Sequence, residues 1–187
     1  MKAARAPGWR IVDSKMVIDT PHLRLRRDEI ELPSGKRVGP YYVRESRGFA
    51  VVFAVTADER VVLVHQYKHG IGRHVLELPA GGIDPDETPQ GCARRELAEE
   101  TGYVGDPAAL ELLGTYVFDP TSSTTTYHLY LARNAHPLLP QRCDDTEDIT
   151  LELATFEQIR RYVANGTIDV GIHIASIYIA LEHLGKR

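Results

Sequence analysis

The residues from Gly81 to Tyr103 constrain the fold of this chain most, because they combine a turn, a helix and a cluster of acidic side chains. Thr88 is a suitable N-cap residue, and Pro89 follows at the first helical position, where its missing N–H is not needed. Gly102 can end the helix, since glycine readily adopts the left-handed conformation. The pattern therefore predicts a helix that begins after Thr88 and ends at Gly102.

Three carboxylates share one side of this expected helix. At roughly 100° per residue, Glu96, Glu99 and Glu100 fall within about a third of the helix circumference, beside the inward-packing residues Ala93 and Leu97. Like charges at this spacing repel each other. A hard divalent cation would turn the repulsion into coordination, because Mg²⁺ and Mn²⁺ favour carboxylate and carbonyl oxygens. The alternative is a solvated acidic helix that binds nothing.

The spacing of these residues resembles the Nudix box. The match runs through Gly81, five residues, Glu87, seven residues, and then Arg95-Glu96-Leu97-x-Glu99-Glu100-x-Gly102-Tyr103. Nudix enzymes hydrolyse nucleoside diphosphates linked to another moiety and use divalent metals held by glutamates of the box. The resemblance implies that Glu96 and Glu100 are the principal metal ligands and that Glu99 is a further ligand or a shared catalytic partner. It gives Glu87 a structural role, with Arg95 as the residue that orients it.

Two segments before the box resemble the branch of the family that contains ADP-ribose pyrophosphatases. Gln66-Tyr67-Lys68 is similar to a Gln-aromatic-Arg triplet, which implies that Lys68 binds the diphosphate as a point charge instead of a bidentate fork. Leu76 to Gly82 is similar to the Leu-Glu-Leu-Pro-Ala-Gly segment of the same branch. It implies that the Ala80 carbonyl is a metal ligand and that Glu77 contributes to substrate binding. The alternatives are a surface lysine and a glutamate exposed at a strand end.

Two segments after the box carry weaker resemblances. Pro120 matches a proline of the ADP-ribose pyrophosphatases, but Thr121 replaces the usual glycine and the loop has no glutamate. Its hydroxyl groups could bind a sugar or only shape the turn. The acidic run from Asp144 to Ile149 resembles the loop that supplies a general base in the sugar-nucleotide branch, and Glu147 is the matching carboxylate. Glu99 is the next candidate for the base, and a solvated acidic loop is the alternative.

The order of strand-like and helix-like segments predicts an α/β chain in two parts. Residues 1–46 read as a small antiparallel sheet around the turn at 33–36, which by itself has too little sequence to bury a core. Residues 47–187 are expected to form a Nudix domain, a mixed sheet sandwiched between helices. In the sugar-nucleotide branch a similar N-terminal segment crosses to a second subunit, so the resemblance implies a homodimer. The alternative is that this sheet packs onto its own catalytic domain.

Composition excludes several other classes. A formal net charge of −4 argues against a general nucleic-acid binder, and the two cysteines have no metal-ligand spacing. The sequence shows neither a long apolar run nor a signal-peptide pattern, so a cytoplasmic protein that does not bind membranes is expected.

The activity that the resemblance implies is hydrolysis of ADP-ribose or a similar nucleoside diphosphate sugar with Mg²⁺ or Mn²⁺. Another Nudix substrate, such as a dinucleotide or a nucleoside triphosphate, and a non-catalytic nucleotide-binding module remain alternatives.

Overall fold

A computed structural model describes residues 8–106, 109–142 and 148–186. The chain divides into two compact units. The first combines Met1–Arg47 with Val117–Thr125, and the second combines Gly48–Tyr116 with Thr126–Arg187. Residues 117–125 lie far from residues 1–47 in the sequence. No local sequence pattern therefore predicts that the two segments belong to one unit.

The first unit is a three-stranded antiparallel sheet in the order β1-β2-β3, with β1 at Arg10–Asp19, β2 at Arg24–Glu31 and β3 at Arg37–Glu45. The expected turn joins β2 to β3, and Gly35 adopts a φ of 82° there. Backbone bonds attach the later segment to β3. The Arg44 amide donates to the Ser122 carbonyl at 2.8 Å, and the Thr124 amide donates to the Arg44 carbonyl at 3.0 Å.

The second unit contains an eight-stranded mixed sheet. Its main path runs in the order β11-β5-β4-β10-β8, while β6 pairs with β5, β7 with β4 and β9 with β10. Among the described residues of this sheet, β4 runs parallel to β10, whereas β4 with β5, β4 with β7, β5 with β6, β5 with β11 and β8 with β10 are antiparallel pairs. The strands are β4 (Phe49–Thr56), β5 (Arg60–Lys68), β6 (Arg73–Glu77), β7 (Ala80–Gly82), β8 (Tyr103–Val104), β9 (Leu110–Val117), β10 (Thr126–Pro137) and β11 (Ile149–Thr155).

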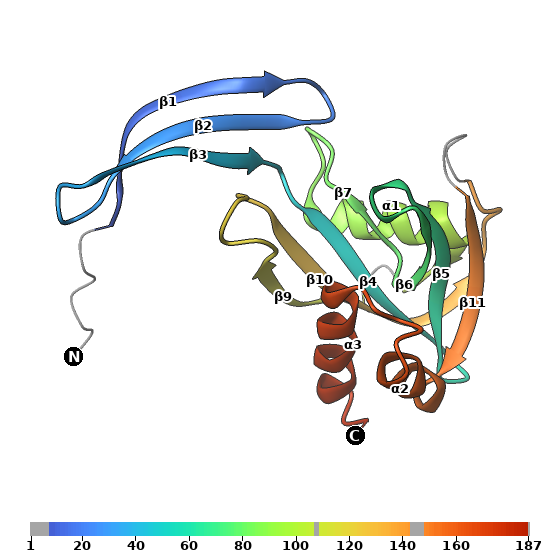
Figure 1. Ribbon diagram of the computed structural model, residues 1–187. Helices are drawn as coiled ribbons and strands as arrows, with labels where there is room; N and C mark the ends of the chain where they lie inside the picture. The colour runs from blue at the N-terminus through green and yellow to red at the C-terminus, as the bar shows by residue number, and fades with distance from the viewer. Residues whose placement is uncertain (1–7, 107–108, 143–147, 187) are drawn as a thin grey trace. The chain divides into compact units, whose positions relative to one another are not determined.

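Strand β4 shows how this sheet is covered on both faces. Side chains alternate along a strand, and in β4 Val51 and Phe53 belong to one buried cluster while Ala50 and Val52 belong to another. The first cluster includes residues of α2 (Phe156–Ala164) and α3 (Gly171–His183), and the second includes residues of α1 (Pro89–Thr101). Figure 1 shows α1 on one side of the sheet and α2 and α3 on the other. The predicted mixed sheet between helices is thus confirmed.

The helix boundaries follow local signals. Thr155 caps α2, and Gln158 completes a capping box with it. A short 3-10 turn, His69–Ile71, joins β5 to β6.

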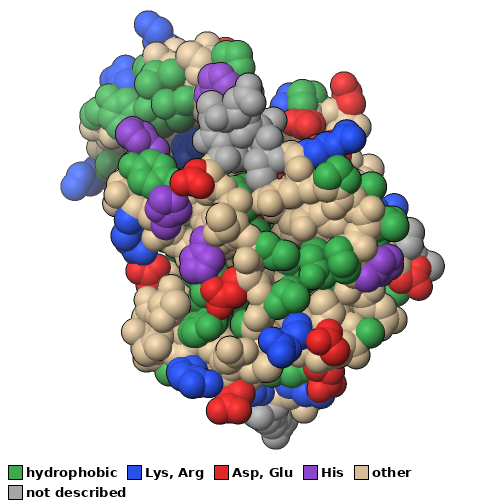
Figure 2. Space-filling view, turned by 90° about the vertical axis from the view of Figure 1, so that its right-hand side faces the viewer, with side chains coloured by type: hydrophobic (Ala, Val, Ile, Leu, Met, Phe, Trp, Pro, Cys, Tyr) green, Lys and Arg blue, Asp and Glu red, His purple; other side chains and the backbone are tan. Residues whose placement is uncertain are grey.

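Within the described ranges, no helix has both the length and the apolar character that a membrane span requires. On the face drawn in Figure 2, acidic and basic side chains are interspersed.

Candidate active site

Helix α1 carries the acidic side chains and is bounded as expected. The Thr88 hydroxyl accepts a hydrogen bond from the Gly91 amide at 3.0 Å, and Pro89 opens the first turn. Gly102 ends the helix with a φ of 71°, and its amide donates to the Ala98 carbonyl at 2.8 Å. These contacts fix both ends of α1 and therefore the position of each glutamate along the helix.

The three clustered glutamates differ in exposure. Glu96 is 9% exposed and Glu100 is 2% exposed, whereas the Glu99 side chain remains 45% exposed. Ala93 and Leu97 are buried beside them, as the helical periodicity predicted. Two carboxylates are therefore enclosed by protein and one lies at the rim, an arrangement that requires compensating positive charge.

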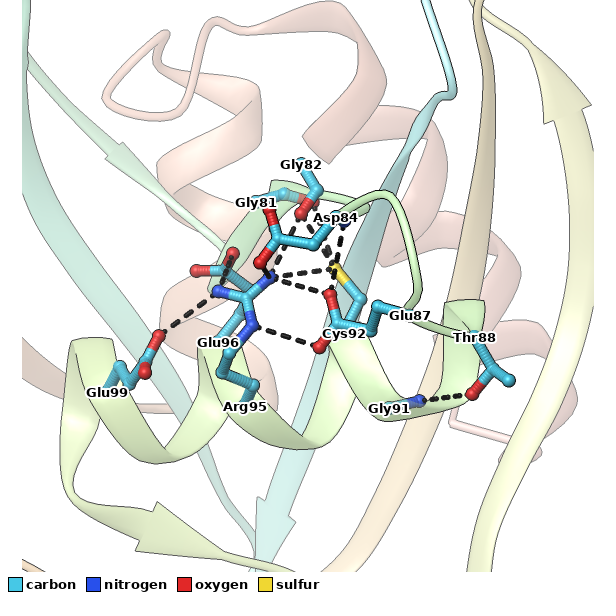
Figure 3. A network of polar contacts seen from close by, with 10 residues as sticks. All are labelled: Gly81, Gly82, Asp84, Glu87, Thr88, Gly91, Cys92, Arg95, Glu96 and Glu99. Carbon is cyan, nitrogen blue, oxygen red and sulfur yellow. Dashed lines mark hydrogen bonds and ion pairs between the residues drawn. The ribbon is translucent and has the colours of Figure 1, made fainter.

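Arg95 supplies part of this compensation. Its guanidinium binds Glu87 through two bonds of 2.9 Å each, and its Nη1 contacts Glu96 at 2.7 Å and Glu99 at 3.1 Å. A further bond of 3.0 Å reaches the Gly82 carbonyl. Figure 3 shows this network around the loop that precedes α1. The hydrogen bonds from Arg95 lower the pKa of Glu87 below its usual value, so that carboxylate remains ionised.

Glu100 lies deeper and is only weakly compensated. Its carboxylate accepts a hydrogen bond from the Ala80 amide at 3.0 Å. Burial raises the pKa of Glu100 to about 8; the bond from Ala80 opposes this effect, and the charge of Glu96 adds to it. A cation next to this carboxylate would favour its ionised form.

The donor atoms of this region fit a hard divalent cation. Glu96, Glu99 and Glu100 supply carboxylate oxygens, and Ala80 brings its backbone next to Glu100. In the described part of the chain, however, no three acidic, imidazole or thiolate side chains converge as in a formed metal centre. In this structure Arg95 Nη1 contacts the carboxylates of both Glu96 and Glu99.

Lys68 and Glu77 form a second polar group. The two strands that carry them pair with Val64 opposite Glu77, so Gln66, Lys68 and Glu77 share one face of the sheet. The Lys68 ammonium donates to the Gln66 carboxamide and contacts Glu77 at 2.5 Å. Lys68 is close enough to α1 for its charge to act on the pKa of Glu100, although burial dominates that pKa.

Glu77 itself is enclosed, because its side chain is 4% exposed. Burial alone would raise its pKa, but the hydrogen bond and charge of His173 and the charge of Lys68 outweigh burial, and the pKa is lowered. The structure thus places this predicted substrate-binding residue beneath Lys68, with both carboxylate oxygens in contact with protein cations or donors.

The two remaining predicted residues lie elsewhere. Pro120 belongs to the first compact unit, where it lines an open pocket of about 510 Å³ together with Trp9, Tyr41 and Thr121. Glu147 lies outside the described residues. Its neighbour Asp148 is described and contacts the His74 imidazole at 2.9 Å.

Sequence reasoning did not identify the contact between His173 and Glu77. His173 is buried on α3, and its Nε2 lies 3.0 Å from a carboxylate oxygen of Glu77. No local signal could reveal this contact, because the two residues are far apart in the chain and meet only after α3 folds against the sheet.

Two domain models match this chain. Residues 46–170 match the model of the NUDIX domain. The chain is a Nudix hydrolase. Residues 9–43 match the nucleoside diphosphate sugar hydrolase N-terminal domain, a segment that accounts for the strands of the first unit. Nudix hydrolases generally use divalent metal ions, which is consistent with the oxygen-rich surface of α1.

Individual relatives of this Nudix hydrolase have several names. It is 29% identical to a methanol dehydrogenase activator of Bacillus methanolicus, over 95% of this chain and 96% of that protein. It is 30% identical to an ADP-ribose pyrophosphatase of Bacillus subtilis (strain 168), over 83% of each chain. An ADP compounds hydrolase of known crystal structure has the same fold, with a TM-score of 0.83 and 18% identity over 99% of this chain and 100% of that one.

Proposed function

We propose that this pyrophosphohydrolase cleaves the diphosphate bond of ADP-ribose or a similar nucleoside diphosphate sugar. The products would be a nucleoside monophosphate and a sugar phosphate, which for ADP-ribose are AMP and ribose 5-phosphate. The observation that carries the proposal is the match of residues 9–43 to the N-terminal domain of nucleoside diphosphate sugar hydrolases. Identities of 30% and 31% to two ADP-ribose pyrophosphatases, over 83% and 82% of this chain, support it.

In this proposal, Glu96, Glu99, Glu100 and the Ala80 carbonyl hold Mg²⁺ or Mn²⁺. When bound there, the cation would neutralise phosphate charge and lower the pKa of the attacking water. The protein contributes the burial of Glu96 and Glu100, which restricts both side chains and excludes bulk water from them. Arg95 holds the carboxylates of Glu96 and Glu99 on one side of the helix, where both would be available to a cation.

Lys68 is the proposed diphosphate ligand. Its ammonium lies at the end of β5, is 39% exposed, and acts electrostatically on Glu100. It can therefore contact a phosphate oxygen while Glu77 and Gln66 hold it from behind. Glu77 would then serve substrate binding through Lys68. Pro120 is also proposed as a substrate-binding residue, from its match to a proline of the ADP-ribose pyrophosphatases.

The proposed general base is Glu147. Carboxylates that bind a cation have their charge and lone pairs engaged, so a separate carboxylate near the water is chemically convenient. Support comes from the acidic run of residues 144–149 and its resemblance to the corresponding loop of the sugar-nucleotide branch. Glu99 is the alternative base, because its side chain is the most exposed of the three on α1.

A homodimer is also part of the proposal. The first unit exposes large apolar side chains on its strands and at Trp9, just before β1, and a single three-stranded sheet has no means of covering them. These exposed residues are Trp9, Ile11, Val17, Ile18, Val38 and Tyr42. A second copy of the chain would cover them.

A substrate screen tests the proposed function. ADP-ribose, other nucleoside diphosphate sugars, dinucleotides and nucleoside triphosphates would be incubated with the protein and Mg²⁺ or Mn²⁺, and phosphate would be measured after coupling to a phosphatase. We expect ADP-ribose or another nucleoside diphosphate sugar to have the highest kcat/KM. Preference for a dinucleotide or a triphosphate would instead identify a different Nudix substrate, and binding without turnover would indicate a non-catalytic module.

A further inference from the structure

His173 connects helix α3 to the polar group around Lys68. Its Nε2 lies 3.0 Å from one carboxylate oxygen of Glu77, while the other oxygen lies 2.5 Å from the Lys68 ammonium. Since an ionised carboxylate only accepts hydrogen bonds, the imidazole donates its Nε2–H. The three side chains thus form a chain of contacts from the first turn of α3 to the surface of β5.

The inner end of this series of contacts, at His173 and Glu77, is buried and therefore rigid. The side chains of His173 and Glu77 are each 4% exposed, whereas Lys68 is 39% exposed. A buried carboxylate that loses one of two partners keeps its desolvation cost, so it would move or become protonated. Either change would reposition the ammonium that depends on it.

The surroundings of His173 leave Glu77 as the contact that determines the ring position. Its Nδ1 is buried and has no hydrogen-bond partner among the described residues. The same helix is anchored in the core by Ile177 and Ala180, which are fully or almost fully buried. The imidazole is therefore carried by a firmly packed helix, and within the described part of the chain its one directed polar bond is to Glu77.

We propose that His173 is a positioning residue that, through Glu77, sets the place of the Lys68 ammonium for diphosphate binding. This inference rests on the proposed role of Lys68 in the hydrolase. His173 itself does not touch the reacting atoms. Loss of its hydrogen bond should weaken the binding of substrate and transition state alike, because Lys68 contacts the diphosphate in both.

Kinetic comparison of three variants tests the proposal with ADP-ribose and Mg²⁺. His173→Leu should raise KM about tenfold with kcat within about twofold of wild type, as expected when a charge-assisted bond is lost. His173→Gln should restore KM to within about threefold, because its amide can donate from a similar position. Ile177→Ala, which removes core volume from the same helix, should lower the melting temperature and leave KM unchanged.

Two further measurements separate positioning from general destabilisation. In a Lys68→Met background, His173→Leu should add less than about twofold to KM, because coupled residues are not additive. In nuclear magnetic resonance spectra of the substrate-free protein, the Lys68 ammonium signal should shift in His173→Leu and return in His173→Gln. The signal is assigned by its loss in Lys68→Met.

Failure of the positioning role of His173 can be distinguished from failure of the proposed function. If ADP-ribose is not turned over, that function fails, while the ammonium signal still decides whether His173 positions Lys68. An unshifted ammonium signal in His173→Leu overturns the positioning role. Additive effects of His173→Leu and Lys68→Met on KM, or a Gln variant as impaired as the Leu variant, also overturn it.

Discussion

Among individual side chains, Glu96 and Glu100 combine burial with carboxylate chemistry. Glu96 is held by Arg95, and Glu100 accepts a hydrogen bond from the Ala80 amide. Burial raises the pKa of Glu100 to about 8, so the neutral form of this group is well tolerated by the fold. Removing the charge should consequently affect a bound cation more than it affects folding.

We expect Glu96→Gln and Glu100→Gln each to lower kcat by about a hundredfold or more, because each removes a charged ligand from the cation. Circular dichroism and the melting temperature of the metal-free protein should change little. The rate would be measured with ADP-ribose over a range of Mg²⁺ concentrations. Glu157→Gln is the control, since the Glu157 side chain is 88% exposed on α2. Near wild-type activity of either variant at limiting Mg²⁺ would contradict the assignment.

The base can be tested separately from the cation ligands. Glu147→Gln should reduce kcat by about a hundredfold with little change in metal affinity, because a base is needed for proton transfer and not for coordination. Asp144→Asn and Asp145→Asn should have mild effects and serve as matched controls from the same acidic run. Rates and Mn²⁺ titrations would be measured across the pH range. If Glu147→Gln keeps full kcat at every pH, Glu147 is not the general base and Glu99 is the next candidate.

Among the secondary-structure elements, β7 and α1 approach each other closely at Gly81. A Cβ atom on Gly81 would lie 1.9 Å from the nearest carboxylate oxygen of Glu96. The obstructing atoms are the end of a flexible side chain, so the backbone need not move. At Gly82 an added Cβ would meet nothing within 4 Å.

This contrast predicts different consequences for two neighbouring glycines. Gly81→Ala should displace the Glu96 carboxylate and raise the Mg²⁺ concentration needed for half-maximal activity, by about tenfold if a single ligand is perturbed. Gly82→Ala should leave this concentration unchanged. Both variants should unfold at similar urea concentrations. If Gly81→Ala and Gly82→Ala need the same Mg²⁺ concentration for half-maximal activity, metal binding does not depend on the place that Gly81 leaves for the Glu96 carboxylate.

The loop before α1 is fastened to the helix by Glu87 and Arg95. Arg95 lowers the pKa of Glu87 below its ordinary value of 4.5, so the pair stabilises the folded protein above that pH. The contribution is lost as the pH falls through the lowered pKa. Glu87→Gln should therefore reduce the free energy of unfolding by about 1 kcal/mol at neutral pH, and by less in acid.

Urea denaturation at several pH values measures this effect. The stability difference between wild type and Glu87→Gln should narrow as the pH falls from about 7 to about 3.5. Asp86→Asn provides the control, because Asp86 is an exposed carboxylate one residue earlier in the same loop. A difference that stays constant across this range would mean that the ion pair does not stabilise the fold.

For the chain as a whole, the central expectation is a dimer that depends on the N-terminal strands. At micromolar concentration the full-length protein should sediment as a dimer, and deletion of residues 1–46 should abolish the dimer because the apolar strands are lost. Ile11→Asp should weaken association, since Ile11 is 52% exposed on β1. Ser34→Asp, in the turn between β2 and β3, should have no effect. A full-length monomer would refute the proposal.

Several features of this molecule could be predicted from short stretches of sequence. The ends of α1 follow from Thr88, Pro89 and Gly102, each of which acts within one helical turn. The turn at residues 33–36 likewise follows from local sequence, and Gly35 adopts a φ of 82° there. The spacing of glutamates on α1 likewise depends only on helical geometry.

Other features arise only when distant segments pack together. His173 reaches Glu77 because α3 folds against the sheet that contains β6, and residues 117–125 join the first unit because their backbone pairs with β3. The charge of Glu100 depends on how completely the surrounding elements exclude water. Contacts of this kind depend on the packing and solvation of the whole fold, and helical or strand periodicity contains no information about which distant residue will be the neighbour.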